Sequence, residues 1–240
     1  RRGRLGADVR RQEARLALRL CLILGAVVCL VVGAFIRLTG RLTALMYPVG
    51  GAGWRRVAVP VVGSFITGYL LFKYFPLARG SGIPQTRAAL FIHDGQISIR
   101  SVVGKFVCST IALATGIPLG REGPSVYIGS GVASVIARRL GLSRAQVRSL
   151  IPVGGAAALA AAFNTPIAAV LFSLEEIVGD LHAPVLGSVV LASAAAWMVL
   201  HLVLGDNPLF HVPGYHLVSL AELGVYVVLG GVRGADSAEV

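Results

Sequence analysis

Long uncharged apolar stretches alternate along the chain with short segments rich in glycine, proline and charge. An α-helix needs roughly 17 to 25 mostly apolar residues to cross the hydrocarbon core of a bilayer. The stretches that reach or approach this length are Leu20–Ile36, Val57–Phe72, Ser149–Leu174 and Ala183–Gly205. Only 14% of the 240 residues are charged, against about a quarter in an ordinary soluble domain. The pattern therefore predicts an all-α, polytopic transmembrane protein.

Several of the predicted helices are short or interrupted. Helices are expected over residues 15–38, 55–75, 100–116, 124–140, 144–163 and 184–204, over "AAVLFSLEE", and from about residue 217. Residues 77–90 are too short and too broken to span, and "FNTP" (Phe163–Pro166) interrupts another apolar stretch. Broken backbone is tolerated at membrane depth only inside protein or beside a watery cavity. Because such half-helices are typical of transport sites, we expect broken or re-entrant helices around an ion site.

The chain has a net charge of +11, much of it in the arginine-rich segment before the first predicted span. Because Lys and Arg are enriched on the cytoplasmic side of spans, we expect the N-terminus in the cytoplasm. Anionic lipid headgroups are its expected contact; nucleic acid is the alternative, but the adjoining span favours the membrane. We assign residues 1–14 as a basic cytoplasmic segment, 15–232 as the transmembrane domain and 233–240 as a polar tail. The expected location is the inner or plasma membrane.

Two of the breaks follow the same pattern. "GSGIP" (Gly80–Pro84) and "GREGP" (Gly120–Pro124) each combine glycines and a polar residue with a proline suited to the first turn of a helix. The N–H groups at a helix start lack intrahelical partners, and with the helix dipole they attract an anion. Glu122 is then a tethered anion that competes for the same place, and its protonation would free the site. A structural ion pair between Arg121 and Glu122 is the alternative interpretation.

Three ordered motifs, "GSGIP", "GREGP" and "NTPIAAVLFSLEE", resemble the CLC family of chloride channels and proton-coupled chloride transporters. The resemblance implies that Ser81 coordinates chloride, with serine rather than the proline that accompanies nitrate preference. It implies that Glu122 is the gating glutamate and outer proton carrier, and that Glu176 is the inner proton relay. Further chloride contacts are then expected at Gly82, Ile83, Gly120, Arg121 and Gly123.

Positions outside these site residues match the family in some cases and depart from it in others. Lys105 matches a basic position of the family, where a cation lowers the cost of holding an anion; snorkelling to an interface is the alternative. Family members often carry acids after "GSGIP", where this chain has Gln85 and Arg87. Many channel-type members lack a carboxylate at the position of Glu176, so its presence favours a transporter. The alternative is that Glu175 and Glu176 are solvated charges at a helix end.

The resemblance also indicates what the chain lacks. Family subunits enclose a pathway between two inverted repeats, and residues 15–232 match only the first. The "GxFxP" break and the inner tyrosine of the second repeat are not found, and "RGADSAEV" has no spanning pattern. We therefore expect a truncated family member. Either another polypeptide supplies the missing wall or the chain does not transport. Full-length members are homodimers.

The leading hypothesis is thus part of a chloride/proton antiporter, with a passive chloride channel and a non-transporting fragment as alternatives. An intramembrane enzyme built on Glu175, Glu176 and His182 lacks a nucleophile and metal-ligand spacing. The thiols in apolar stretches are expected to be small hydrophobic groups: Cys21, Cys29 and Cys108. We therefore expect no enzymatic activity, no catalytic residue, no metal and no cofactor, with chloride and protons as substrates and no nucleic-acid partner.

Overall fold

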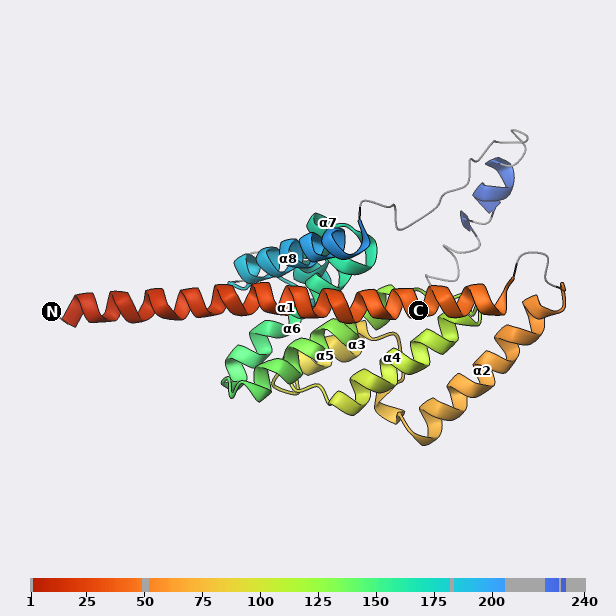
Figure 1. The fold of residues 1–240 in the computed structure, drawn as a ribbon, viewed down its shortest axis with the longest axis horizontal. Coiled ribbons are helices and arrows are strands. Elements are labelled where there is room, and N and C mark those ends of the chain that lie inside the picture. Colours follow the sequence, from red (N-terminus) through yellow and green to blue (C-terminus); the bar gives the residue numbers. More distant parts are fainter. Residues whose placement is uncertain (1, 49–51, 182–183, 206–222, 229, 232–240) are drawn as a thin grey trace. The chain divides into compact units, whose positions relative to one another are not determined.

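The computed structural model describes residues 2–48, 52–181, 184–205, 223–228 and 230–231. Two compact units make up the chain, Arg1–Asn207 and Pro208–Val240. In the second unit residues 223–228 and 230–231 are helical, and the other residues of the predicted C-terminal helix and the tail lie outside the described residues. The fold that positions the candidate site belongs to the first unit, whose described residues are all helices and connecting turns (Figure 1).

The helices of the first unit match the predicted order. They are α1 (Arg2–Met46), α2 (Arg55–Lys73), α3 (Ile83–Phe91), α4 (Ile99–Ala114), α5 (Glu122–Arg139), α6 (Arg144–Phe163), α7 (Pro166–Phe172) and α8 (Leu186–Leu204). A short 3₁₀ turn, Pro76–Ala78, precedes α3, and a π-helical turn, Ser173–Val178, follows α7. The predicted all-α fold is therefore confirmed for the described residues.

The first helix is longer than the apolar pattern predicts. It begins at Arg2 instead of residue 15 and continues to Met46 instead of residue 38. The added segments are rich in Arg, Leu, Ala and other good helix formers, and no proline occurs before Pro48. Apolar length measures the part of a helix that lipid can cover, whereas backbone propensity decides where the helix ends.

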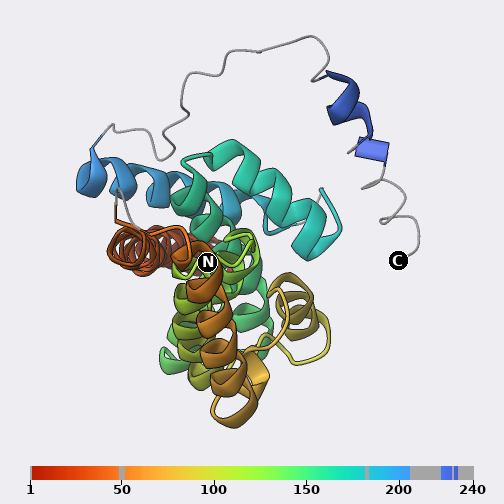
Figure 2. The same cartoon turned by 90° about the vertical axis from the view of Figure 1, so that its right-hand side faces the viewer.

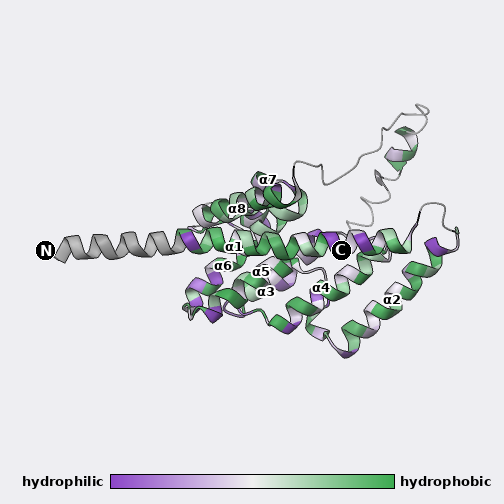
Figure 3. Cartoon of the chain, viewed as in Figure 1, coloured by the Kyte–Doolittle hydropathy of each residue, from purple (hydrophilic) through white to green (hydrophobic). Residues whose placement is uncertain are grey.

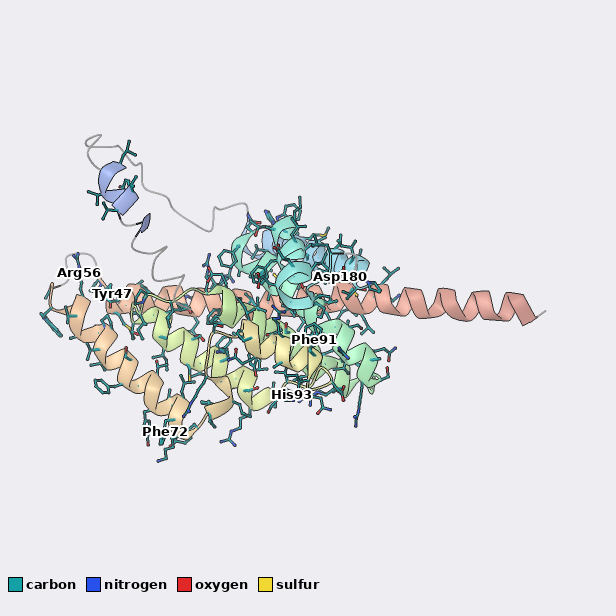
Figure 4. All side chains as sticks on the ribbon, turned by 180° about the vertical axis from the view of Figure 1, so that it is seen from behind. Tyr47, Arg56, Phe72, Phe91, His93 and Asp180 are labelled. Atoms are coloured by element: carbon teal, nitrogen blue, oxygen red, sulfur yellow. The ribbon has the colours of Figure 1, made fainter. Side chains whose placement is uncertain are left out.

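Four helical segments are long and apolar enough to cross a membrane: Leu18–Met46, Arg55–Lys73, Arg144–Phe163 and Leu186–Val203. Hydrophobic residues make up most of these helices (Figure 3). Their burial differs, since 78% of the apolar window in α6 is buried and only 6% of that in α2. Side chains of α2 such as Phe72, which is 77% exposed, point outward (Figure 4). Helix α6 therefore forms the centre of the unit and α2 its edge.

Small residues allow the central helices to touch through their backbones. A Cβ added to Gly154 in α6 would overlap the carbonyl oxygen of Gly129 in α5, and a Cβ on Gly129 would overlap that of Gly154. The hydroxyl of Ser130 donates to the carbonyl of Ile151 across the same contact, at 2.9 Å. Close approach of this kind stabilises helix pairs in lipid, where apolar burial gives little drive. The run Gly154–Ala162, built almost entirely of glycine and alanine, is buried at this centre of the unit.

Helices α1 and α8 lie side by side and run in the same direction. Gly25 of α1 contacts the backbone of Ala192, so closely that a Cβ would overlap its carbonyl oxygen. Further along both helices, the Arg37 guanidinium donates to the carbonyl oxygen of Val203 at 3.2 Å. In a view along α1, α8 lies on one side of it and α2 to α5 on the other (Figure 2). The pair α1–α8 therefore forms one flank of the unit.

Candidate functional site

The first break is a glycine-built turn that ends at the start of α3. Gly80 and Gly82 have φ angles of 82° and 121°, values that residues with a side chain adopt only under strain. Ser81 lies exposed between them, and α3 begins at Ile83, with Pro84 in its first turn. The predicted proline-started helix is confirmed.

The second break leads directly into α5. That helix begins at Glu122, two residues before the predicted start at Pro124, so the glutamate belongs to its first turn. A Cβ added to Gly120 would overlap Glu122 Oε2 and would lie 3.0 Å from Glu122 Cδ. The carboxylate therefore folds back over Gly120, at the helix end where the dipole favours negative charge.

The two breaks touch each other through their glycines. A Cβ on Gly82 would overlap the carbonyl oxygen of Gly123, and a Cβ on Gly123 would overlap that of Ser81 and lie 3.5 Å from Ser81 Cβ. Any side chain at either glycine would push the breaks apart. The sequence motifs contain this requirement, but the contact itself appears only in the fold.

As a consequence, Ser81 and Glu122 line the same cavity, which has a volume of about 410 Å³. Helices α2 and α4 contribute apolar residues to its wall, including Leu71, Ala112 and Leu113. Among the predicted site residues, the cavity is also lined by Ile83, Gly120 and Gly123. Five of the eight predicted positions thus line one cavity, and Gly82, Arg121 and Glu176 do not line it.

The backbone N–H of Gly82 is hydrogen-bonded to Gln85, a residue that was not among the predicted site residues. This N–H donates to Oε1 of Gln85 at 2.9 Å, and Nε2 of the same amide donates to the carbonyl oxygen of Arg79 at 3.0 Å. The chloride contact expected at Gly82 stays a prediction; in this structure the Gly82 N–H is already hydrogen-bonded to the side chain of Gln85. A Gln three residues after a helix N-cap is a known capping signal, so the sequence contained the clue.

Lys105 is hydrogen-bonded to the same turn, at Gly80. Its Nζ donates to the carbonyl oxygen of Gly80 at 2.6 Å and lies 5.6 Å from the centre of the Tyr127 ring. The residue is 3% exposed and lines the cavity with Ser81 and Glu122. Lys105 is therefore an interior cation next to the turn, and its side chain does not reach out to an interface.

Arg121 points to a different part of the unit. Its guanidinium carbon lies 4.9 Å from the centre of the Phe163 ring, at the end of α6. There Asn164 ends the helix with a left-handed φ of 58°, and Pro166 starts α7. Arg121 therefore joins the second break to "FNTP". It does not line the cavity, and its chloride contact stays a prediction.

Glu176 lies on the opposite side of the α3 start. It belongs to the π-helical turn after α7 and lines a groove of about 500 Å³ together with Pro84 and Arg87. Glu175 does not line this groove. Ile83 lines both the groove and the Ser81–Glu122 cavity, so the first turn of α3 separates the two glutamates. A π-helical turn is often found at functional sites.

Comparison with known proteins identifies relatives of this chain. The profile of the family described as "Voltage gated chloride channel" matches residues 63–238. The H(+)/Cl(-) exchange transporter ClcA of Vibrio cholerae is 33% identical over 177 residues, covering 71% of this chain and 37% of the relative. Chloride channel protein CLC-f of Arabidopsis thaliana is 32% identical over 192 residues, covering 77% and 24%. The chain thus spans little more than a third of the length of the ClcA relative.

Solved structures show the same fold. A CLC-type fluoride/proton antiporter superposes with a TM-score of 0.70 at 24% identity, covering 93% of this chain and 55% of that chain. A slow cyanobacterial Cl-/H+ antiporter gives a TM-score of 0.64 at 22% identity, covering 91% and 54%. In both comparisons this chain corresponds to about half of the larger protein.

Proposed function

The chain belongs to the CLC family of voltage-gated chloride channels, and we propose that it forms one wall of a pathway that exchanges chloride for protons. The observation that carries this proposal is the contact between Gly82 and Gly123, which places Ser81 and Glu122 on one cavity. The relative ClcA supports it, since ClcA is a proton/chloride exchange transporter. Because the chain spans only part of each relative, we assign the second wall to a segment equivalent to the part that it does not cover.

In this proposal chloride rests between Ser81 and the start of α5. The Ser81 hydroxyl donates to the anion, and the first-turn N–H groups of α5 add the positive end of the helix dipole. Lys105 contributes a positive charge behind the turn without direct contact, since its ammonium group is bonded to the Gly80 carbonyl. The Glu122 carboxylate competes with chloride for this position. A proton on Glu122 removes the competing charge and admits the halide.

The proton route runs from Glu122 to Glu176 past the first turn of α3. The presence of a carboxylate at Glu176, lining a groove that shares the residue Ile83 with the cavity, supports exchange over passive conduction. Chloride and protons are the substrates, and the pathway uses neither a metal nor an organic cofactor. We assign no catalytic residue to the chain and propose transport, not enzymatic catalysis.

The same reasoning gives the cellular setting. We propose that the chain lies in the inner or plasma membrane with its arginine-rich N-terminal segment in the cytoplasm, held by anionic headgroups. The complete transporter is proposed to be a homodimer with one pathway in each subunit.

Chloride binding to the detergent-solubilised chain tests the half-site without requiring a complete pathway. Titration calorimetry should show that Ser81→Ala weakens chloride binding about fivefold, the equivalent of one hydrogen bond of about 1 kcal/mol. Glu122→Gln should strengthen binding, because the neutral amide no longer competes as an anion. Ser98→Ala, outside the cavity, is the control. Unchanged chloride affinity in both site variants would exclude the proposed site.

A further inference from the structure

A second cavity lies away from the transport site, in the groove between α1 and α8. It has a volume of about 330 Å³, at the lower end of the range for small-molecule pockets. One part of its lining is apolar and comes from both helices, with Cys29, Gly33 and Leu200 among its residues. The remainder is basic, since Arg37 and Arg41 line it one helical turn apart on α1.

The apolar and basic parts of the groove follow each other along the membrane normal, in the same way as the tails and headgroup of a phospholipid. The uncharged run of α1 ends at Ile36, immediately before the first of the two arginines. Both α1 and α8 contain segments apolar enough to span, so the apolar part of the groove faces acyl chains. The arginines then lie at the edge of the hydrocarbon, where lipid phosphates are found.

The charge of the groove is uncompensated. No acidic residue lines it, and among the described residues neither arginine forms an ion pair. Arg37 has the Val203 carbonyl as its partner at 3.2 Å, which fixes its guanidinium at the end of α8 and leaves further N–H donors. Two guanidinium groups on one helix face suit a phosphate, which accepts paired hydrogen bonds from arginine.

Space for the lipid tail comes from Gly33. A Cβ added there would meet no atom within 4 Å, so the groove is open at this point. We propose that the α1–α8 groove binds one anionic phospholipid, with its phosphate between Arg37 and Arg41 and an acyl chain along Gly33. A zwitterionic headgroup would bring its own cation toward two arginines, so the site selects a lipid with net negative charge.

Native mass spectrometry of the detergent-solubilised chain, titrated with phosphatidylglycerol or phosphatidylcholine, tests this proposal. We expect one tightly bound phosphatidylglycerol and weaker binding of phosphatidylcholine. The double variant Arg37→Gln/Arg41→Gln should lose about fivefold in phosphatidylglycerol affinity for each arginine removed. Its matched control is Arg55→Gln/Arg56→Gln at the start of α2 (Figure 4), which removes the same charge outside the groove and should keep the tight binding.

A third variant keeps both arginines and fills the apolar part. Gly33→Leu places a side chain in open space, so the fold is retained while the lipid tail is excluded, and tight binding should be lost. Equal losses in the groove and control variants would show non-specific attraction to charge and overturn the proposal. Displacement of the lipid by soluble glycerol phosphate at equal concentration would also overturn it, because the site would then bind free anions.

Discussion

Gly123 is packed against the carbonyl group of Ser81 so tightly that one methyl group on Gly123 would overlap it. This contact brings two separate breaks together on a single cavity with a hydroxyl and a carboxylate on its wall. Glycine is thus required here for the approach of two backbones. The position of the proposed ion site depends on this contact.

Gly123→Ala should separate the breaks. The added methyl forces a backbone shift, and overpacking of this kind costs about 1 to 3 kcal/mol. We expect a lower thermal unfolding temperature in detergent and weakened chloride binding. Gly68→Ala on α2 is the control, because its Cβ would meet nothing within 4 Å; that variant should be as stable as the parent chain. Undiminished chloride binding in Gly123→Ala would contradict the role of the contact.

Lys105→Met tests the interior cation. The substitution leaves the Gly80 carbonyl without its 2.6 Å partner and removes a positive charge from behind the cavity. A hydrogen bond from a charged group contributes about 1.5 to 3 kcal/mol, so the unfolding temperature and the chloride affinity should both fall. The chain's other lysine provides the control, since Lys73 is exposed on α2 and Lys73→Met should change neither measurement. Equal chloride affinities for the two variants would show that Lys105 does not act on the anion.

Gln85→Glu keeps one of the two hydrogen bonds that Gln85 makes in the turn and removes the other. A carboxylate still accepts from the Gly82 N–H, but it cannot donate to the Arg79 carbonyl as the amide does. We expect the helix start to persist and chloride affinity to fall, because a second anion now stands at the turn. Gln146→Glu, in the capping box that begins α6, is the matched control and should leave chloride binding unchanged. A chloride affinity equal to that of the parent chain would contradict this view of Gln85.

The helices and breaks were predictable from sequence because their signals are local. Glycine and proline mark the turns at residues 80–84 and 120–124, and the predicted helix starts differ from the observed ones by two residues or fewer at α4, α5 and α8. The extent of α1 was underestimated, since arginine-rich segments form helix without being apolar. Local pattern thus finds the elements, whereas propensity sets their full length.

The site was only partly predictable because its contacts join distant segments. Nothing in "GSGIP" or "GREGP" alone says that Gly82 touches Gly123, and the orientation of Arg121 toward Phe163 depends on where α6 ends. The hydrogen bond from the Gly82 N–H to Gln85 is a local effect, and the three-residue spacing of a capping box predicts it. The π-helical turn that sets the directions of Glu175 and Glu176 has no sequence signal that we can identify.

Glu176→Gln addresses the proton route through that turn. Of the two adjacent acids, Glu176 lines the groove beside α3 and Glu175 does not, which makes Glu175→Gln a control of equal charge. In proteoliposomes that hold the complete pathway, a chloride gradient should drive proton uptake with the parent protein and with Glu175→Gln. Glu176→Gln should abolish proton uptake while chloride efflux continues, because an amide cannot carry the proton but leaves the Ser81–Glu122 cavity intact. If the two variants lost proton uptake equally, the acids would act only through their joint charge, and the assignment of the relay to Glu176 would fail.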